Sequence, residues 1–145
     1  MRQVRELPVD IAWELALHEA WRTDRGGRRA NLQSLDLRGV DFQGMDLRGA
    51  DFSYSDLRRA DFRGANLYGA ILLCTQLQYA DFRSANLHFA NLRSTYFHYT
   101  DFRGANLMEA YFQGAYLQDS NRATDLLGVA KAVGLDRLMP MTPVY

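Results

Sequence analysis

Every fifth residue between Asn31 and Leu117 is Leu or Phe, without interruption. Two positions before these large residues the chain most often carries Ala. A regular helix cannot hold this pattern on one side, because five steps of about 100° carry the apolar residue off any fixed face. A long strand cannot hold it either, because an odd spacing alternates between the two faces of an extended chain. The eighteen residues are Leu32, Leu37, Phe42, Leu47, Phe52, Leu57, Phe62, Leu67, Leu72, Leu77, Phe82, Leu87, Leu92, Phe97, Phe102, Leu107, Phe112 and Leu117.

A chain that turns once in each five-residue repeat can keep all of these residues inside. The small and the large residue then point inward, the other three point outward, and the architecture is a solenoid. A second period of twenty sets the number of sides, because Phe42 and Asp41 recur at this spacing. Like side chains stack well between coils at the strand spacing of about 4.8 Å. We therefore expect four repeats per coil and two core ladders, Phe42, Phe62, Phe82 and Phe102, and Leu47, Leu67, Leu87 and Leu107.

Three stretches carry the repeat in its clearest form: ADFRGANLYGA (60–70), ADFRSANLHFA (80–90) and TDFRGANLMEA (100–110). They resemble the pentapeptide repeat family, and the resemblance covers about ninety of the 145 residues. It implies an all-β solenoid, namely a right-handed quadrilateral β-helix, which eighteen repeats would extend to about four and a half coils. The segment HEAWRTDRGGRRANL (18–32) also resembles the lead-in that is common in this family.

The ends of the chain differ from the repeats, so we expect three parts: residues 1–29, 30–119 and 120–145. The first part is predicted to be a capping helix followed by a Gly/Arg turn. Within LPVDIAWELALHEAWR (7–22), Asp10 is the expected N-cap and Gly26 and Gly27 the expected end. Because a solenoid exposes its core at both ends, the apolar residues of this helix are expected to cover the first coil; a partner-binding helix is the alternative. These residues are Ile11, Trp13, Leu15, Leu17 and Trp21, with Trp13, Leu17 and Trp21 on one side.

The last part, 120–145, is predicted to form a second capping helix over TDLLGVAKAV (124–133), followed by an extended tail. The first face of the coil, which is centred on Leu32, carries two apolar residues outside Leu72, namely Ile71 and Leu73. Two outward apolar neighbours need a cover. We expect the segment with Leu135, Leu138, Met139 and Met141 to fold back over them; a second subunit is the alternative.

Residue types with chemical reactivity are few and scattered. His88 and His98 lie ten residues apart, which places them on opposite faces of a four-sided coil, and Cys74 is alone. The chain has no phosphate-binding loop, metal-ligand spacing or nucleophile elbow. We therefore expect neither an enzyme nor a cofactor or metal. Without a signal peptide or a membrane-spanning apolar run, a cytoplasmic location is expected.

The best-known activity that the resemblance implies is binding of DNA gyrase or another type II topoisomerase by an acidic rod that imitates DNA. Residues 30–119 contain ten acidic residues and eight Arg, a net charge of −2. A rod of about 22 Å would replace duplex DNA with on the order of 13 negative charges. The ladder Asp41, Asp61, Asp81 and Asp101 is moreover followed by Arg63, Arg83 and Arg103, which offset its charge. A DNA-mimicking gyrase modulator is therefore our alternative hypothesis.

Aromatic residues favour a different surface, the second face of the coil, centred on Leu37, Leu57, Leu77 and Phe97. The register places Tyr79 one coil from Tyr99 and Tyr96 one coil from Tyr116. Tyr is a typical anchor at protein interfaces, although stacked Tyr residues could instead only stabilise neighbouring coils. We predict a non-enzymatic protein-binding module, a monomer or an end-to-end or side-by-side homodimer, whose partner is an unidentified protein; direct binding to nucleic acid or membrane is not expected. The predicted site is Tyr79, Tyr96, His98, Tyr99, Tyr111 and Tyr116.

Overall fold

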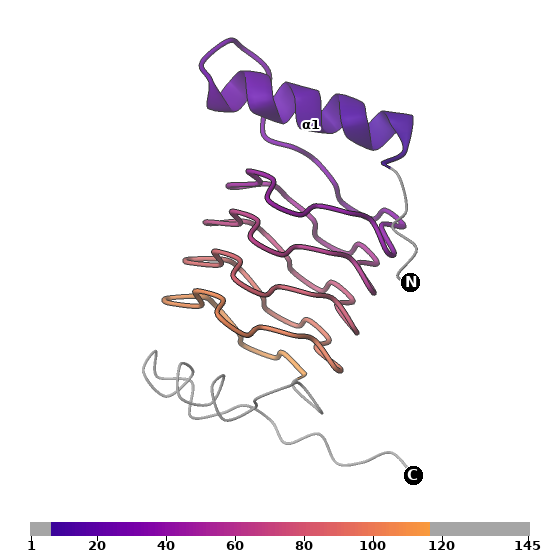
Figure 1. Ribbon diagram of the computed structural model, residues 1–145, viewed down its shortest axis with the longest axis vertical. Helices are drawn as coiled ribbons and strands as arrows, with labels where there is room; N and C mark the ends of the chain where they lie inside the picture. The colour runs from indigo at the N-terminus through magenta and orange to yellow at the C-terminus, as the bar shows by residue number, and fades with distance from the viewer. Residues whose placement is uncertain (1–6, 117–145) are drawn as a thin grey trace.

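The computed structural model describes residues 7–116 and consists of one helix followed by a stack of coils (Figure 1). Helix α1 spans Val9–Arg22 and lies across the N-terminal end of the stack. The extended positions of the coils are single parallel bridges separated by turns rather than long strands. The chain is thus a β-helical solenoid with a helix at its first coil.

The coils repeat every twenty residues. Each bridge joins a residue to the one twenty positions later, from Asn31 with Asp51 to Tyr96 with Tyr116. Backbone hydrogen bonds follow the same register; for example, Leu32 N donates to Asp51 O at 2.7 Å. Because bridges recur every five residues, one coil contains four repeats, as the sequence predicts.

The interior of the solenoid is a continuous apolar core. Every predicted large residue from Leu32 to Phe112 is buried, and Phe102, at 6% exposed, is the most accessible of them. Phe62 stacks on Phe42 with ring centroids 4.9 Å apart and on Phe82 at 4.7 Å. Both predicted ladders are therefore inside, and Leu117 lies outside the described residues.

At the corner of each repeat, one residue adopts the left-handed backbone conformation, with a positive φ angle. In the turn after Leu37, the N–H of Val40 donates to Leu37 O at 3.2 Å, and Gly39 between them has φ +68°. A positive φ at the third turn residue alone is the geometry of a type II turn, which favours Gly because Gly lacks a Cβ. Seven Gly residues occupy such corners, at positions 39, 44, 49, 64, 69, 104 and 114.

Helix α1 begins and ends differently from the sequence prediction. Pro8 is the N-cap, and Asp10 lies in the first turn without capping it, so the predicted cap is wrong. The helix ends at Arg22, before the two Gly residues, and Asp24 takes the left-handed conformation with φ +56°. In the turn after the helix, position 27 must be Gly, because a Cβ there would lie 2.3 Å from Leu17 O.

One side of α1 packs against the first coil, but it is not the side that contains the Trp residues. Ile11 is buried as part of the core, and Leu15 packs against the core while half-buried. Trp13 is 67% exposed and Trp21 42% exposed, so the predicted contact of both Trp residues with the core is wrong. The packed residues Ile11, Leu15 and His18 follow the spacing of three and four expected for a helix face.

Polar side chains of α1 also bind the backbone of the first coil. The buried His18 accepts a hydrogen bond from the Ala30 N–H at its Nδ1, at 3.1 Å. Glu14 accepts the Asn31 N–H at 3.2 Å and pairs with Arg28, whose Nη1 lies 2.9 Å from Oε2. These bonds give partners to N–H groups at the edge of the first coil, which lies next to α1.

His18 should make stability depend on pH. Burial lowers its pKa from the ordinary 6.5, against the attraction of Asp46 and Glu19, while Arg22 lowers it further. The unfolded chain therefore binds a proton before the folded chain does, and stability falls as pH drops below 6.5 towards the folded pKa. We expect the urea midpoint to fall between pH 7.5 and 5.5, and His18→Asn, which keeps an acceptor but does not titrate, to flatten this slope. An unchanged slope in that variant would contradict this origin.

Two predictions concern residues beyond the described range. The C-terminal helix over 124–133 and the segment with Leu135, Leu138, Met139 and Met141 lie outside residues 7–116.

Within the described part of the chain, no helix has the length and apolar character needed to cross a bilayer.

Candidate functional site: the tyrosine-bearing second face

The predicted Tyr residues of the second face are exposed. Tyr79 and Tyr99 are 48% and 45% accessible, and Tyr96 and Tyr116 are 42% and 37% accessible. His98 is half-buried beside Tyr99, with ring centroids 4.5 Å apart in an edge-to-face arrangement. Tyr111, on the first face, is also exposed.

The second face arranges its Tyr residues in two columns along the solenoid. Tyr96 and Tyr116 stack with centroids 4.6 Å apart and an interplanar angle of 6°. Tyr79 and Tyr99 stack at 5.1 Å and 20°. The Arg59 guanidinium lies 5.1 Å from the ring centre of Tyr79 and extends this column by one coil. Because contacts with Arg59 and Tyr99 use both faces of the Tyr79 ring, its edge and hydroxyl group remain for a partner.

The backbone at Tyr79 and Tyr99 is in a conformation that bulky residues rarely adopt. Their φ angles are +63° and +52°, and Arg59 has +62°. A left-handed L-residue costs about 1–2 kcal/mol, whereas cross-strand pairs return about 0.2–1 kcal/mol each. Other corners without Gly, for example Tyr54 and Phe89, share this conformation, so stacking returns only part of a cost that many corners of the fold carry.

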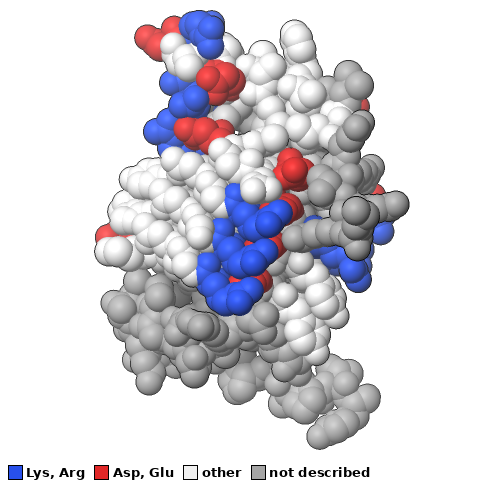
Figure 2. Space-filling model, in the orientation of Figure 1, with Lys and Arg blue, Asp and Glu red and all other residues white. Residues whose placement is uncertain are grey.

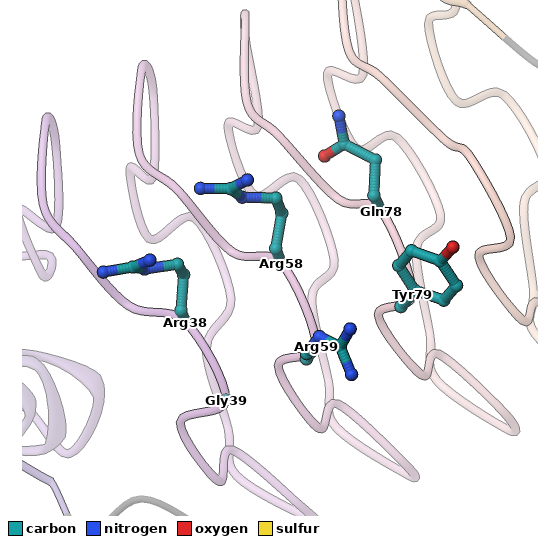
Figure 3. A pocket seen from close by; sticks show the side chains of 6 residues that line it. All are labelled: Arg38, Gly39, Arg58, Arg59, Gln78 and Tyr79. Carbon is teal, nitrogen blue, oxygen red and sulfur yellow. The ribbon is translucent and has the colours of Figure 1, made fainter.

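A shallow pocket of about 550 Å³ lies next to the Tyr79 column. In Figure 3, Arg38, Arg58 and Gln78 form one row across successive coils, and Gly39, Arg59 and Tyr79 form the row beside it. Arg38 and Arg58 pair with the carboxylates two residues before them, Asp36 at 2.8 Å and Asp56 at 2.6 Å. The lining thus combines a Tyr ring with three guanidinium groups.

On the third face, centred on Phe42, Phe62, Phe82 and Phe102, the carboxylates of Asp61, Asp81 and Asp101 form ion pairs with Arg side chains. Asp61 and Asp81 are only 2% and 6% exposed. Arg63 binds Asp61 at 2.7 Å and reaches Asp81 of the next coil at 3.8 Å. Figure 2 shows basic side chains in a column over the coils with acidic ones beside them. The predicted offset of charge is present at Asp61, Asp81 and Asp101, whereas Asp41 accepts a hydrogen bond from the Gln43 N–H.

These ion pairs also keep the carboxylates ionised. The hydrogen bond from Arg103 lowers the pKa of Asp101, and the bond from Arg58 lowers that of Asp56. Each of these two carboxylates therefore carries a charge that a neighbouring guanidinium neutralises. Such a surface differs from the unpaired phosphates of DNA.

His88 and His98 lie on different faces and in separate ring clusters. His88 stacks on Tyr68, with centroids 5.5 Å apart, and His98 contacts Tyr99. Among residues 7–116, no group of His, Cys, Asp or Glu could hold a metal ion. The lone Cys74 is half-buried at a corner with φ +55°.

The structure adds aromatic residues that the sequence reasoning did not select. Tyr68, His88 and Phe89 form a cluster on the fourth face, centred on Leu47, Leu67, Leu87 and Leu107. Tyr54, at a corner of the first face, is 61% exposed. The twenty-residue register could have found Tyr68 with His88, because they are one coil apart. Arg59 with Tyr79 follows the same rule.

Ile71 and Leu73 of the first face are half-buried. The C-terminal residues expected to cover them lie outside the described range. That the C-terminal segment covers Ile71 and Leu73 therefore stays a prediction.

The period of twenty, the stacked interior and the left-handed corners define a β-helical repeat protein. The profile of pentapeptide repeats matches in eight copies, over residues 28–64, 52–88, 60–98 and 85–121. The chain belongs to the pentapeptide repeat family. No curated protein matches it significantly.

Several solved structures are similar to this chain. The pentapeptide repeat protein alr5209 from Nostoc Pcc 7120 is 32% identical over 88% of this chain and 95% of its own, with a TM-score of 0.45. AT2G44920, a pentapeptide repeat protein from the Arabidopsis thaliana thylakoid lumen, is 28% identical over 69% and 77%, with a TM-score of 0.36. QnrB1, a plasmid-mediated fluoroquinolone resistance protein, is 30% identical over 57% of this chain and 47% of its own, with a TM-score of 0.33.

Proposed function

We propose that this protein is a non-enzymatic, cytoplasmic protein-binding module whose site is the tyrosine-bearing second face. In this proposal the repeats form a right-handed quadrilateral β-helix of about four and a half coils with a helix capping each end. The observation that carries the proposal is the pair Tyr79 and Tyr99, which are nearly half exposed in corners that favour Gly. Exposed, ordered Tyr rings supply contact area at low entropic cost.

The experiment compares two sets of Tyr residues in the same corner position. Tyr79→Ala together with Tyr99→Ala should abolish capture of the partner from a host lysate. The circular dichroism spectrum should be unchanged, and the loss of stacking should cost at most about 1–2 kcal/mol. Tyr54→Ala is the matched control, because Tyr54 has φ +64° and is more exposed, but lies on the first face.

Two results would overturn the proposal. Proteins retained equally by the double variant and by Tyr54→Ala would leave the Tyr columns with a stacking role only. Alternatively, inhibition or protection of DNA gyrase that falls steeply with salt and persists in the double variant would favour the DNA-mimicking hypothesis. A Tyr-anchored interface should depend little on salt, because it gains little from exposed charges.

A further inference from the structure

A second pocket lies where α1 meets the fourth face. Its volume is about 520 Å³, and it combines residues of the helix, the following turn and two coils. The fourth face lies opposite the second in a four-sided coil, so both surfaces are accessible at the same time. The lining residues are Trp21, Arg22, Arg29, Arg48, Gly49, Tyr68 and Gly69.

The charge of this pocket is positive. Its lining contains three Arg and no carboxylate. Arg22 pairs with Glu19 at 2.8 Å and with Asp46 at 3.1 Å, and Arg48 Nε lies 2.9 Å from Asp46. Arg29 differs, because among the described residues its guanidinium contacts the Trp21 ring, at 5.7 Å, and no carboxylate. One cation therefore remains for an anionic group of a ligand.

Two aromatic rings border the pocket and are held by packing. Trp21 and Tyr68 are 42% and 44% exposed. The ring of His18 lies 5.5 Å from Trp21, and the ring of His88 stacks 5.5 Å from Tyr68. Rings fixed in this way lose little side-chain entropy when a ligand packs on them.

Small residues keep the space between the rings open. A Cβ at Gly69 would meet no atom within 4 Å, and one at Gly49 would lie 3.0 Å from Arg29 Cδ. Gly49 thus leaves room for the Arg29 side chain to lie over the fourth face. The result is an exposed Trp21 ring with the Arg29 guanidinium next to it.

We propose that this pocket binds an acidic peptide segment of a partner protein. A carboxylate of the segment pairs with Arg29, and an adjacent apolar side chain packs on Trp21 and Tyr68. Charge complementarity selects an acidic partner. A small molecule such as a nucleotide would be mostly enclosed by its site, whereas both rings here stay more than 40% exposed. The inference does not depend on the function proposed for the second face.

The fluorescence of Trp21 provides a direct measurement. The chain contains two Trp, and Trp13 is 67% exposed, so Trp13→Phe leaves Trp21 as the single indole. In this background we would titrate a hexapeptide with blocked ends, DEFDEL, and its uncharged counterpart NQFNQL. We expect a saturable change with DEFDEL and binding at least about tenfold weaker for NQFNQL. Raising the salt concentration should weaken DEFDEL binding as well.

Variants then test which cations act. Arg29→Gln should weaken DEFDEL binding about tenfold or more, while Arg103→Gln on the third face should leave it unchanged. Melting midpoints of the variants verify that each is folded. Equal binding of both peptides, no response to DEFDEL, or unchanged binding in the Arg29→Gln variant would each refute the proposal. A response to AMP without one to DEFDEL would instead indicate a site for small anions.

Discussion

Replacing Phe82 with Ala should lower the free energy of unfolding by about 3–5 kcal/mol. Phe82 is fully buried in the middle of its ladder, and its ring stacks on Phe62 at 4.7 Å and on Phe102 at 5.2 Å. Coils on both sides hold these neighbouring rings in place, so the cavity cannot close without breaking the bridges at Asp61 and Asp101. Urea denaturation followed by circular dichroism would measure the loss.

Phe82→Leu is the matched control for this variant. Leu already occupies the equivalent inward position on the fourth face, for example at Leu87, and fills much of the space. We expect its cost to stay below about 1.5 kcal/mol. Since each coil supports only its neighbours, the Ala variant should destabilise the coils on both sides of residue 82. An unfolding curve for Phe82→Ala that overlays that of the parent would contradict the inward ladder.

The interior of this fold could be predicted from the sequence because one local rule generates all of it. A turn at every fifth residue places Leu37, Phe42 and Leu47 inside by the same backbone geometry, whatever the neighbouring coils contain. The period of twenty then predicts which side chains stack. For this reason the pairs Tyr79 with Tyr99 and Tyr96 with Tyr116 could be derived from the sequence.

The position of α1 could not be derived in this way. A spacing of four on Trp13, Leu17 and Trp21 is as regular as the spacing of the residues that pack. The rotation of the helix is set by contacts across a non-repeating turn, where His18 binds the backbone of Ala30 and Gly27 approaches Leu17. Neither contact has a sequence period.

The pocket beside α1 could not be predicted either, because it also depends on contacts that no sequence repeat describes. Trp21 and Tyr68 belong to different kinds of structure, and no repeat relates their positions. Arg29 was visible in the sequence only as one of several Arg residues in a Gly-rich turn. Its contact with Trp21 depends on how the turn returns the chain to the first coil.

Removal of residues 1–25 should cause the chains to associate with one another through the exposed N-terminal end of the solenoid. The helix buries Ile11 against the core and supplies the acceptors His18 and Glu14 to the edge. Without the helix, the core residues of the first coil and the N–H groups of Ala30 and Asn31 become exposed to solvent. Exposed edges and apolar surface favour pairing between chains. Size-exclusion chromatography with light scattering should show a mass that rises with protein concentration.

Two single changes in the full chain separate capping from a general effect of altering the helix. Ile11→Asp places an unpaired carboxylate in a site that is 4% exposed, so we expect a loss of several kcal/mol or local detachment of α1, with the same association as the truncated chain. Trp13→Asp changes a side chain that is 67% exposed and should leave both mass and stability close to the parent. If Ile11→Asp and the truncated chain remained monodisperse at high concentration, α1 would not be a cap. If only Trp13→Asp changed the mass or the stability, the outer side of the helix would be the side that prevents association.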